Sequence, residues 1–431
     1  MSNKPCRKSL AVFGNRNYRL LMLANAVNRF GDSVDAIVFT WLTYTLTRQA
    51  AFSALVFAAN RLPSVVLQPL AGVWMERRPK RRAMVVTDIL RGLLVGYILL
   101  RLLTGLPTPA ELLIFTLLIS TVEAFRQPAG SAILPQIVPP EQYTDAVSYL
   151  SGVGSASELV GTGLGAVLIG ILGNAGAMAV DVATFFLSAL LLSAMALQET
   201  LPDRVERFSP GKMVRELGGG ISLVKKSRAL SYLMLLAVAL HALLTPFNSL
   251  QAAMTGEILH GDAGVVSVVG VGLSLDMIAG AALYPALSKR IPVDKLLLMA
   301  SISLSGMYLG TVAVGHWTAA PAALYGSLGI LMLLAGFGVA ILNNFSSVLI
   351  LQKCDRAYLS RISGLMGSLG SAATPATSLV VAVLANFVST KALFVGSGLL
   401  VLVICGLMFQ PRMVPAELYK NQEIQSGGMQ R

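Results

Sequence analysis

Polar side chains gather on one face of the first long apolar segment, residues 20–45. On a helix that turns about 100° per residue, five of them fall within a wedge of about 120°: Asn25, Asn28, Arg29, Asp32 and Asp35. Asp32 lies about 18 Å from either end of the segment at 1.5 Å per residue. These residue types at this spacing could bind a proton or a cation, with Asp32 or Asp35 carrying the site. The alternative is an internal ion pair with Arg29 or Arg61 that only fixes helix packing.

Further acids and bases interrupt the later apolar segments of the first half. Glu123 and Arg126 are three residues apart, so they lie one above the other on a helix and form either a proton relay or a structural pair. Glu158 is a third candidate proton site, with helix packing as the alternative. Acids outnumber bases inside these segments, and a buried carboxyl without a basic partner tends to bind a proton. We expect Asp181, near the end of its segment, to be structural.

The second half offers less of this chemistry. Asp276 and His241 are the ionisable residues that lie clearly inside its apolar segments. Asn248 and Asn343 are neutral polar candidates for the wall of a cavity, with hydrogen bonding between helices as the alternative. We therefore expect the ionisable groups of the first half to carry most of the function.

The elements that must position these residues are long apolar helices. The chain has 431 residues, of which 55% are hydrophobic and 13% charged, and its mean hydropathy is +0.70. This composition excludes a soluble enzyme, a disordered chain and a disulfide scaffold, and the continuous apolar runs exclude an outer-membrane barrel. A membrane helix needs about 20 apolar residues. We expect an all-α membrane protein with twelve transmembrane helices, placed at 20–45, 52–74, 83–103, 111–134, 146–172, 176–197, 230–255, 264–287, 295–314, 320–350, 362–388 and 392–410.

The formal charge of +12 has a topological explanation. Most Lys and Arg residues fall in the tails and in alternate loops, which would all lie on one side of the membrane. Cytoplasmic loops carry such an excess, so we expect a multi-pass protein of a bacterial-type inner membrane with both termini in the cytoplasm. The basic face would attract anionic membrane lipid, and nucleic acid is not an expected partner.

The predicted helices divide the chain into two halves. We expect a cytoplasmic tail at 1–19, six-helix bundles at 20–197 and 230–410, a central loop with an interfacial helix at 198–229, and a second cytoplasmic tail at 411–431. Three scattered cysteines and three histidines form no metal-ligand pattern, so we expect no metal and no cofactor. The sequence also lacks a phosphate-binding loop of the Walker type, which makes an ion gradient the expected energy source.

One segment resembles a family motif. Residues 72–81 read Gly-Val-Trp-Met-Glu-Arg-Arg-Pro-Lys-Arg, similar to the Gly-x-x-x-Asp-Arg-x-Gly-Arg/Lys-Arg/Lys loop between helices 2 and 3 of the major facilitator superfamily. Glu76 replaces the family's Asp and Pro79 replaces its Gly. Residues 15–47 and 125–152 resemble the macrolide-efflux and related drug:proton antiporter branch, whereas Gly161-Thr162 stands where exporters of that branch have Gly-Pro.

This resemblance implies a fold and an activity. The fold would be two pseudo-symmetric six-helix bundles that alternate around a central cavity. The activity would be proton-driven export of an amphipathic neutral or cationic compound, such as a macrolide-like drug, by a monomer without enzymatic activity. The alternative within the same fold is a transporter dedicated to one metabolite, such as a siderophore or a lysophospholipid. A membrane enzyme or sensor would need a catalytic cluster or a signalling domain, which the sequence lacks.

The resemblance also implies roles for particular residues. Arg126 with Gly130 loosely matches the Arg-x-x-x-Gly motif of proton antiporters, in which a buried arginine tunes a nearby acid. The loop motif implies a charge lock that holds one conformational state, and the alternative is a set of solvated charges that fix topology. The residues expected in the lock are Gly72, Glu76, Arg77, Lys80, Arg81, Asp88 and Arg91.

Overall fold

The computed structural model describes most of the helical chain. The described residues are 10–76, 78–139, 142–197, 227–291, 293–317, 321–353 and 359–408. Their long elements are all helices, as expected for an all-α membrane protein, and none of them is a strand. The predicted interfacial helix falls almost wholly outside these residues, and so does the predicted tail at 411–431, whereas the second half of the predicted tail at 1–19 forms η1 and the start of α2.

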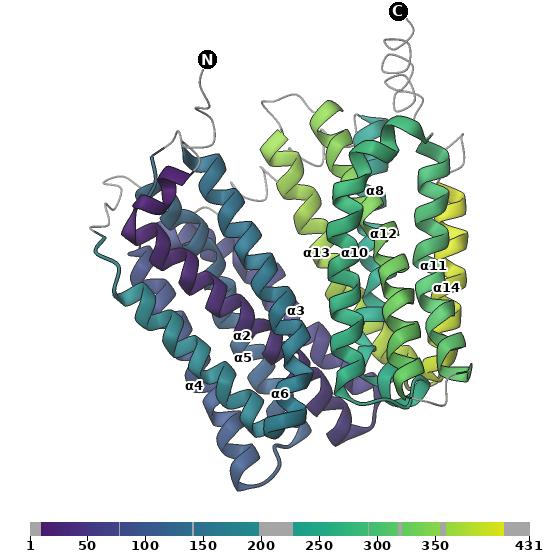
Figure 1. Ribbon diagram of the computed structural model, residues 1–431, viewed down its shortest axis with the longest axis horizontal. Helices are drawn as coiled ribbons and strands as arrows, with labels where there is room; N and C mark the ends of the chain where they lie inside the picture. The colour runs from purple at the N-terminus through teal and green to yellow at the C-terminus, as the bar shows by residue number, and fades with distance from the viewer. Residues whose placement is uncertain are drawn as a thin grey trace, which may run out of the picture. The chain divides into compact units, whose positions relative to one another are not determined.

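Within each half of the chain, long helices follow one another with short connections (Figure 1). The first half contains α2 (Arg16–Thr47), α3 (Ala50–Glu76), α4 (Lys80–Thr104), α5 (Pro109–Ile133) and α6 (Tyr143–Ser193), with the 3-10 turns η1 (Leu10–Gly14) and η2 (Leu134–Gln136). The second half contains α8 (Arg228–Ser249), α9 (Gln251–Ala253), the π-helical turn η4 (Met254–Ile258), α10 (Ala263–Arg290), α11 (Val293–Trp317), α12 (Pro321–Lys353), α13 (Leu359–Leu384) and α14 (Thr390–Met408).

Helix starts are set by local chemistry. The Asn15 side chain accepts hydrogen bonds from the backbone N–H groups of Asn17 and Tyr18 and so caps α2. At α5, Thr108 and Glu111 form a reciprocal capping box, and Pro109 occupies the first turn, where its missing N–H costs nothing. These caps fix where α2 and α5 begin, and therefore the depth at which their charged residues lie.

Helix α6 is interrupted at one glycine. Gly173 has φ 69° and ψ 177°, a conformation that residues with a side chain rarely adopt. The break falls between the predicted segments 146–172 and 176–197. The apolar stretch Asp145–Ser193 has 49 residues, and a single crossing needs about 20, so this stretch is long enough for two crossings.

Eight helical segments within the described residues are long and apolar enough to cross a membrane. Helices α2 and α5 are not among them, although they pack with α4 and α6. Both carry charged residues in mid-sequence, at Arg29, Asp32 and Asp35 in α2 and at Glu123 and Arg126 in α5. These charged residues lower the mean hydropathy of α2 and α5, and they belong to the candidate chemistry.

The chain forms two compact units. The first unit comprises Met1–Arg48 and Ala59–Phe208, and the second unit comprises Gln49–Ala58 and Ser209–Arg431. In the first unit, α2 packs closely on α6, because Gly161 leaves room for the carbonyl oxygen of Phe30. A Cβ at position 161 would lie 2.6 Å from that oxygen. This close approach holds the charged face of α2 against α6.

Candidate functional site

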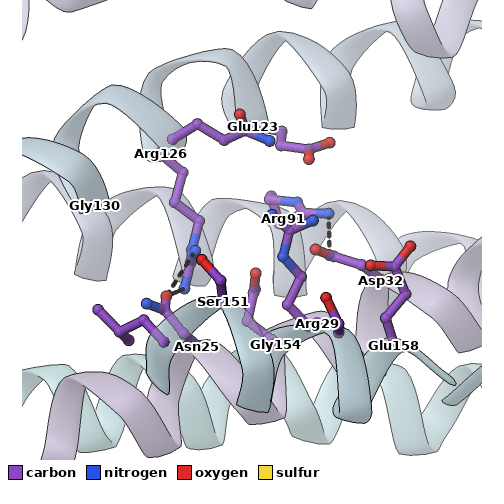
Figure 2. A pocket seen from close by; sticks show the side chains of 14 residues that line it. Asn25, Arg29, Asp32, Arg91, Glu123, Arg126, Gly130, Ser151, Gly154 and Glu158 are labelled. Carbon is purple, nitrogen blue, oxygen red and sulfur yellow. Dashed lines mark hydrogen bonds and ion pairs between the residues drawn. The ribbon is translucent and has the colours of Figure 1, made fainter. Parts of the chain in front are cut away.

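A cavity of about 360 Å³ lies within the first unit. Helices α2, α4, α5 and α6 all contribute to its wall (Figure 2). Its charged lining residues are Arg29, Asp32, Arg91, Glu123, Arg126 and Glu158. In Figure 2, Asp32, Glu123 and Glu158 gather toward one end, and Asn25, Arg126 and Gly130 toward the other. The wall therefore combines acids and bases in a space large enough for water or part of a small molecule.

Asp32 forms an ion pair with Arg91. The Nη2 atom of Arg91 donates to Oδ1 of Asp32 at 2.7 Å. Arg91 is only 2% exposed, and its guanidinium carbon lies 4.4 Å from the ring centroid of Phe185, within the range of a cation–π contact. The Nε and Nη1 atoms of Arg91 are buried without a hydrogen-bond partner. Arg91 therefore has N–H groups at the cavity wall that could donate further hydrogen bonds.

A second ion pair joins α5 to α4. The Nε atom of Arg126 donates to Oδ1 of Asp88 at 2.5 Å, and the hydroxyl of Ser188 donates to Oδ2 of Asp88 at 2.6 Å. Longer bonds of 3.4 Å run from Arg126 to Oδ1 of Asn25. Asp88 is fully buried and both of its oxygens accept a hydrogen bond, so this carboxylate is well satisfied. Arg126 thus binds an acid on a neighbouring helix rather than Glu123.

Three of the charged lining residues take part in no ion pair within the described residues. They are Glu123 on α5, Glu158 on α6 and Arg29 on α2. Glu123 is half-buried, whereas Glu158 and Arg29 are exposed to the cavity. Because water can reach these groups, they can exchange protons or meet a charged ligand without first breaking a buried pair.

Asp35 lies next to the cavity but does not line it. Its Oδ1 atom is buried and has no hydrogen-bond partner. Four of the five polar residues predicted on one face of α2 therefore line the cavity: Asn25, Asn28, Arg29 and Asp32. The fifth, Asp35, lies one turn beyond Asp32.

The residues expected in the charge lock are distributed differently. Asp88 and Arg91 pair with Arg126 and Asp32 at the cavity, not with the loop. The description does not extend to Arg77, to the Glu76 side chain or to the surroundings of Gly72, so the lock itself stays a prediction. Of the remaining two residues, Lys80 is buried at the start of α4, and a guanidinium nitrogen of Arg81 donates to the carbonyl of Met195 just after α6.

The candidates in the second half belong to the other compact unit. Asn248 lies near the end of α8 with an exposed side chain. The Asn343 side chain falls outside the described residues. A role for these two residues in the wall of a cavity stays a prediction.

The structure adds small residues of α6 that the sequence analysis did not assign to the site. Ser151, Gly154 and Ser155 line the cavity together with Glu158. They are spaced three, four and seven residues apart, which places them on one helix face. A period of small and polar residues leading to Glu158 could have identified this face from the sequence.

Comparison with known proteins assigns the fold to a family. Residues 21–376 match the Major Facilitator Superfamily. The chain belongs to this family, and it is accordingly a multi-pass membrane transporter of a bacterial-type membrane.

Among its relatives is macrolide efflux protein A of Streptococcus pyogenes, 24% identical over 377 residues that cover 86% of this chain and 90% of that protein. The multidrug efflux pump Tap of Mycolicibacterium fortuitum is 23% identical over 410 residues, covering 93% and 97%.

Solved structures support the same fold. The nucleoside transporter NupG has a TM-score of 0.70 at 12% identity and covers 91% of this chain and 99% of its own. A bacterial homologue of the iron transporter ferroportin, in an inward-facing state, has a TM-score of 0.67 at 16% identity and covers 91% and 98%. These two transporters share the fold, although one is named for nucleosides and the other for iron.

Proposed function

We propose that the protein exports an amphipathic neutral or cationic compound in exchange for protons. The observation that carries this proposal is the cavity of the first unit, where Glu123 and Glu158 face the space and form no ion pair within the described residues. Once the pairs Asp32–Arg91 and Asp88–Arg126 are set aside, two acids and one base remain free at the wall. The unpaired charge of the cavity is therefore acidic, which favours a proton or a cation.

The mechanism uses these carboxyls as carriers. When the cavity faces the side of high proton concentration, Glu123 or Glu158 takes up a proton. When it faces the other side, the proton leaves and the cargo binds. Transporters of this architecture achieve such switching by rocking one helical bundle against the other.

The size of the site and the relatives bear on the cargo. A volume of about 360 Å³ is at the lower end of the 300–1,000 Å³ typical of small-molecule sites. Relatives named as macrolide and multidrug efflux proteins support an amphipathic drug as the cargo class. We also propose that both termini face the cytoplasm, from the bias of basic residues in the loops.

Transport in liposomes tests this proposal. Purified protein, reconstituted and given an imposed pH gradient, should accumulate a macrolide or a cationic dye, and an uncoupler should abolish this accumulation. Glu123→Gln and Glu158→Gln should each lose most gradient-driven accumulation, because glutamine cannot carry the proton. Asp145→Asn, an acid-to-amide change in the first turn of α6, is the control. Accumulation that is indifferent to the gradient would rule out proton exchange.

A susceptibility panel tests the breadth of the cargo. A strain lacking the protein should become sensitive to several unrelated amphipathic drugs. Sensitivity restricted to a single compound, or none, would contradict a multidrug role.

A further inference from the structure

Behind the cavity lies a buried acid that neither ion pair uses. Asp181, on α6, is 0% exposed, and its Oδ2 atom has no hydrogen-bond partner. Its Oδ1 atom has one weak contact of 3.4 Å with the hydroxyl of Thr184, and that hydroxyl also donates to the Asp181 carbonyl at 2.7 Å. No basic side chain among the described residues forms an ion pair with Asp181.

Asp181 packs directly on α2. A Cβ at Gly31 would lie 2.7 Å from Oδ1 of Asp181, so the absence of a side chain at Gly31 is what admits the carboxyl. Asp35 follows Gly31 by four residues, which places it on the same face of α2 one turn further on. Its Oδ1 atom is likewise buried and unpartnered.

The charged groups around this pair are few. Asp181 interacts electrostatically with Asp35 and Asp32 on α2 and with Arg91 on α4. Asp35 interacts with Arg91, Asp32 and Glu123. Arg91 is thus the base that both acids share, and its one ion pair is with Asp32.

The surroundings are otherwise apolar. Val34 and Val38 flank Asp35 on α2, and Met178 and Phe185 lie one turn either side of Asp181 on α6, all within one hydrophobic cluster. Burying an ionised carboxylate in such a place without a partner is very costly, and the group neutralises instead. Among the described residues, Arg91 is the base that acts on both acids, and its ion pair is with Asp32, so one positive charge stands against three carboxyls.

We propose that Asp181 and Asp35 form a proton-holding carboxyl pair behind the cavity and that Asp181 is a proton-coupling residue of the transport cycle. This inference rests on the proposed proton exchange. In the state described here both carboxyls hold a proton. When Asp35 gives its proton to cavity water, its O–H bond breaks and the resulting carboxylate is stabilised by Arg91, whose Nε and Nη1 donors are free. The proton of Asp181 then moves to the Asp35 carboxylate, which leaves Asp181 ionised until another proton enters from the cavity.

Infrared difference spectroscopy tests the protonated state without relying on transport. The wild-type protein at neutral pH should show the C=O band of a buried carboxylic acid, with the isotope shift of an exchangeable proton in heavy water. Asp181→Asn and Asp35→Asn should each remove part of this band, because asparagine mimics the protonated acid in shape but lacks its absorption. Asp145→Asn, on the same helix as Asp181, should leave the band unchanged. An unaltered band in Asp181→Asn would overturn the proposal.

A second measurement covers the case in which Asp181→Asn does not fold. In Asp35→Asn, the pH at which the remaining Asp181 band disappears should differ from that in the wild type, because the neighbouring group can no longer ionise as the pH rises. An identical titration would show that the two groups do not form a pair and would overturn the proposal.

Transport separates this inference from the proposed function. Asp181→Asn should lose gradient-driven accumulation, and the pH profile of its transport should flatten. If the wild-type protein moves cargo without proton flux, the proposed proton exchange fails, and with it the coupling role of Asp181. If proton flux is intact in both the wild type and Asp181→Asn, only the role of Asp181 is overturned.

Discussion

The two compact units differ in how they use buried charge. In the described part of the first unit, five charged residues are buried: Lys80, Asp88, Arg91, Arg126 and Asp181. In the described part of the second unit, Asp276 is the buried charged residue, and its Oδ2 atom accepts from the backbone N–H of Phe337. The second unit also packs an aromatic group, Phe247, Tyr308 and Phe394. The difference in buried charge is what the proposed proton exchange in the first unit would require.

The largest expected effect comes from removing the shared base of the first unit. Arg91→Ala leaves Asp32 without its partner at the cavity wall, and breaking a buried pair costs about 3–5 kcal/mol. We expect a large drop in the melting temperature in detergent and loss of transport. Arg82→Ala, an exposed arginine on the same helix, is the control and should be near neutral. A wild-type melting temperature for Arg91→Ala would mean that the charges of the first unit are not held by mutual pairing.

The two units can also be compared by what a methyl group would meet at their glycines. Gly161→Ala in the first unit places a Cβ 2.6 Å from the backbone oxygen of Phe30, which cannot move without shifting α2, so we expect a cost of about 1–3 kcal/mol. Gly370→Ala in the second unit meets the ring of His241 at 2.8 Å, and a side chain can turn aside, so its cost should be smaller. Gly152→Ala has no atom within 4 Å and is the control on α6. Thermal unfolding in detergent should rank the three in this order.

A smaller effect is expected in the aromatic group of the second unit. The Tyr308 hydroxyl donates to the carbonyl of Leu243 at 2.6 Å and accepts from the backbone N–H of Phe247 at 3.1 Å. Tyr308→Phe removes both bonds and should cost about 1 kcal/mol. The pH profile of transport should be unchanged, because no titration is assigned to this group. A shifted profile would show that the second unit takes part in proton handling.

The sequence was sufficient to predict the fold class and one wall of the site. Continuous apolar runs predicted an all-α membrane protein, and the loop at 72–81 pointed to the family. The 100° periodicity of the first segment placed Asn25, Asn28, Arg29 and Asp32 on one face, and all four line the cavity. Periodicity works here because it depends on one helix alone.

The partners of these residues were not predictable in the same way. Asp88 and Arg91 were grouped with the nearby loop because they are close to it in sequence, yet they pair with Arg126 and Asp32. Such pairs depend on how far each helix is rotated and displaced against its neighbours, which no single segment encodes. Asp181 was expected to be structural from its position near the end of its segment, and nothing in that segment reveals that Gly31 makes room for it.

The aromatic ring beneath Arg91 has a consequence for electrical measurements. The face of Phe185 attracts the guanidinium independently of the Asp32 carboxylate, so the ring helps to hold the positive charge of Arg91 in place. A protein charge that stays in place contributes no current. The net charge carried in each turnover is then that of the protons and cargo alone, and each elementary charge carried across 100 mV is worth about 2.3 kcal/mol. Current recorded from proteoliposomes, divided by the measured cargo flux, would therefore give the charge moved per cargo molecule.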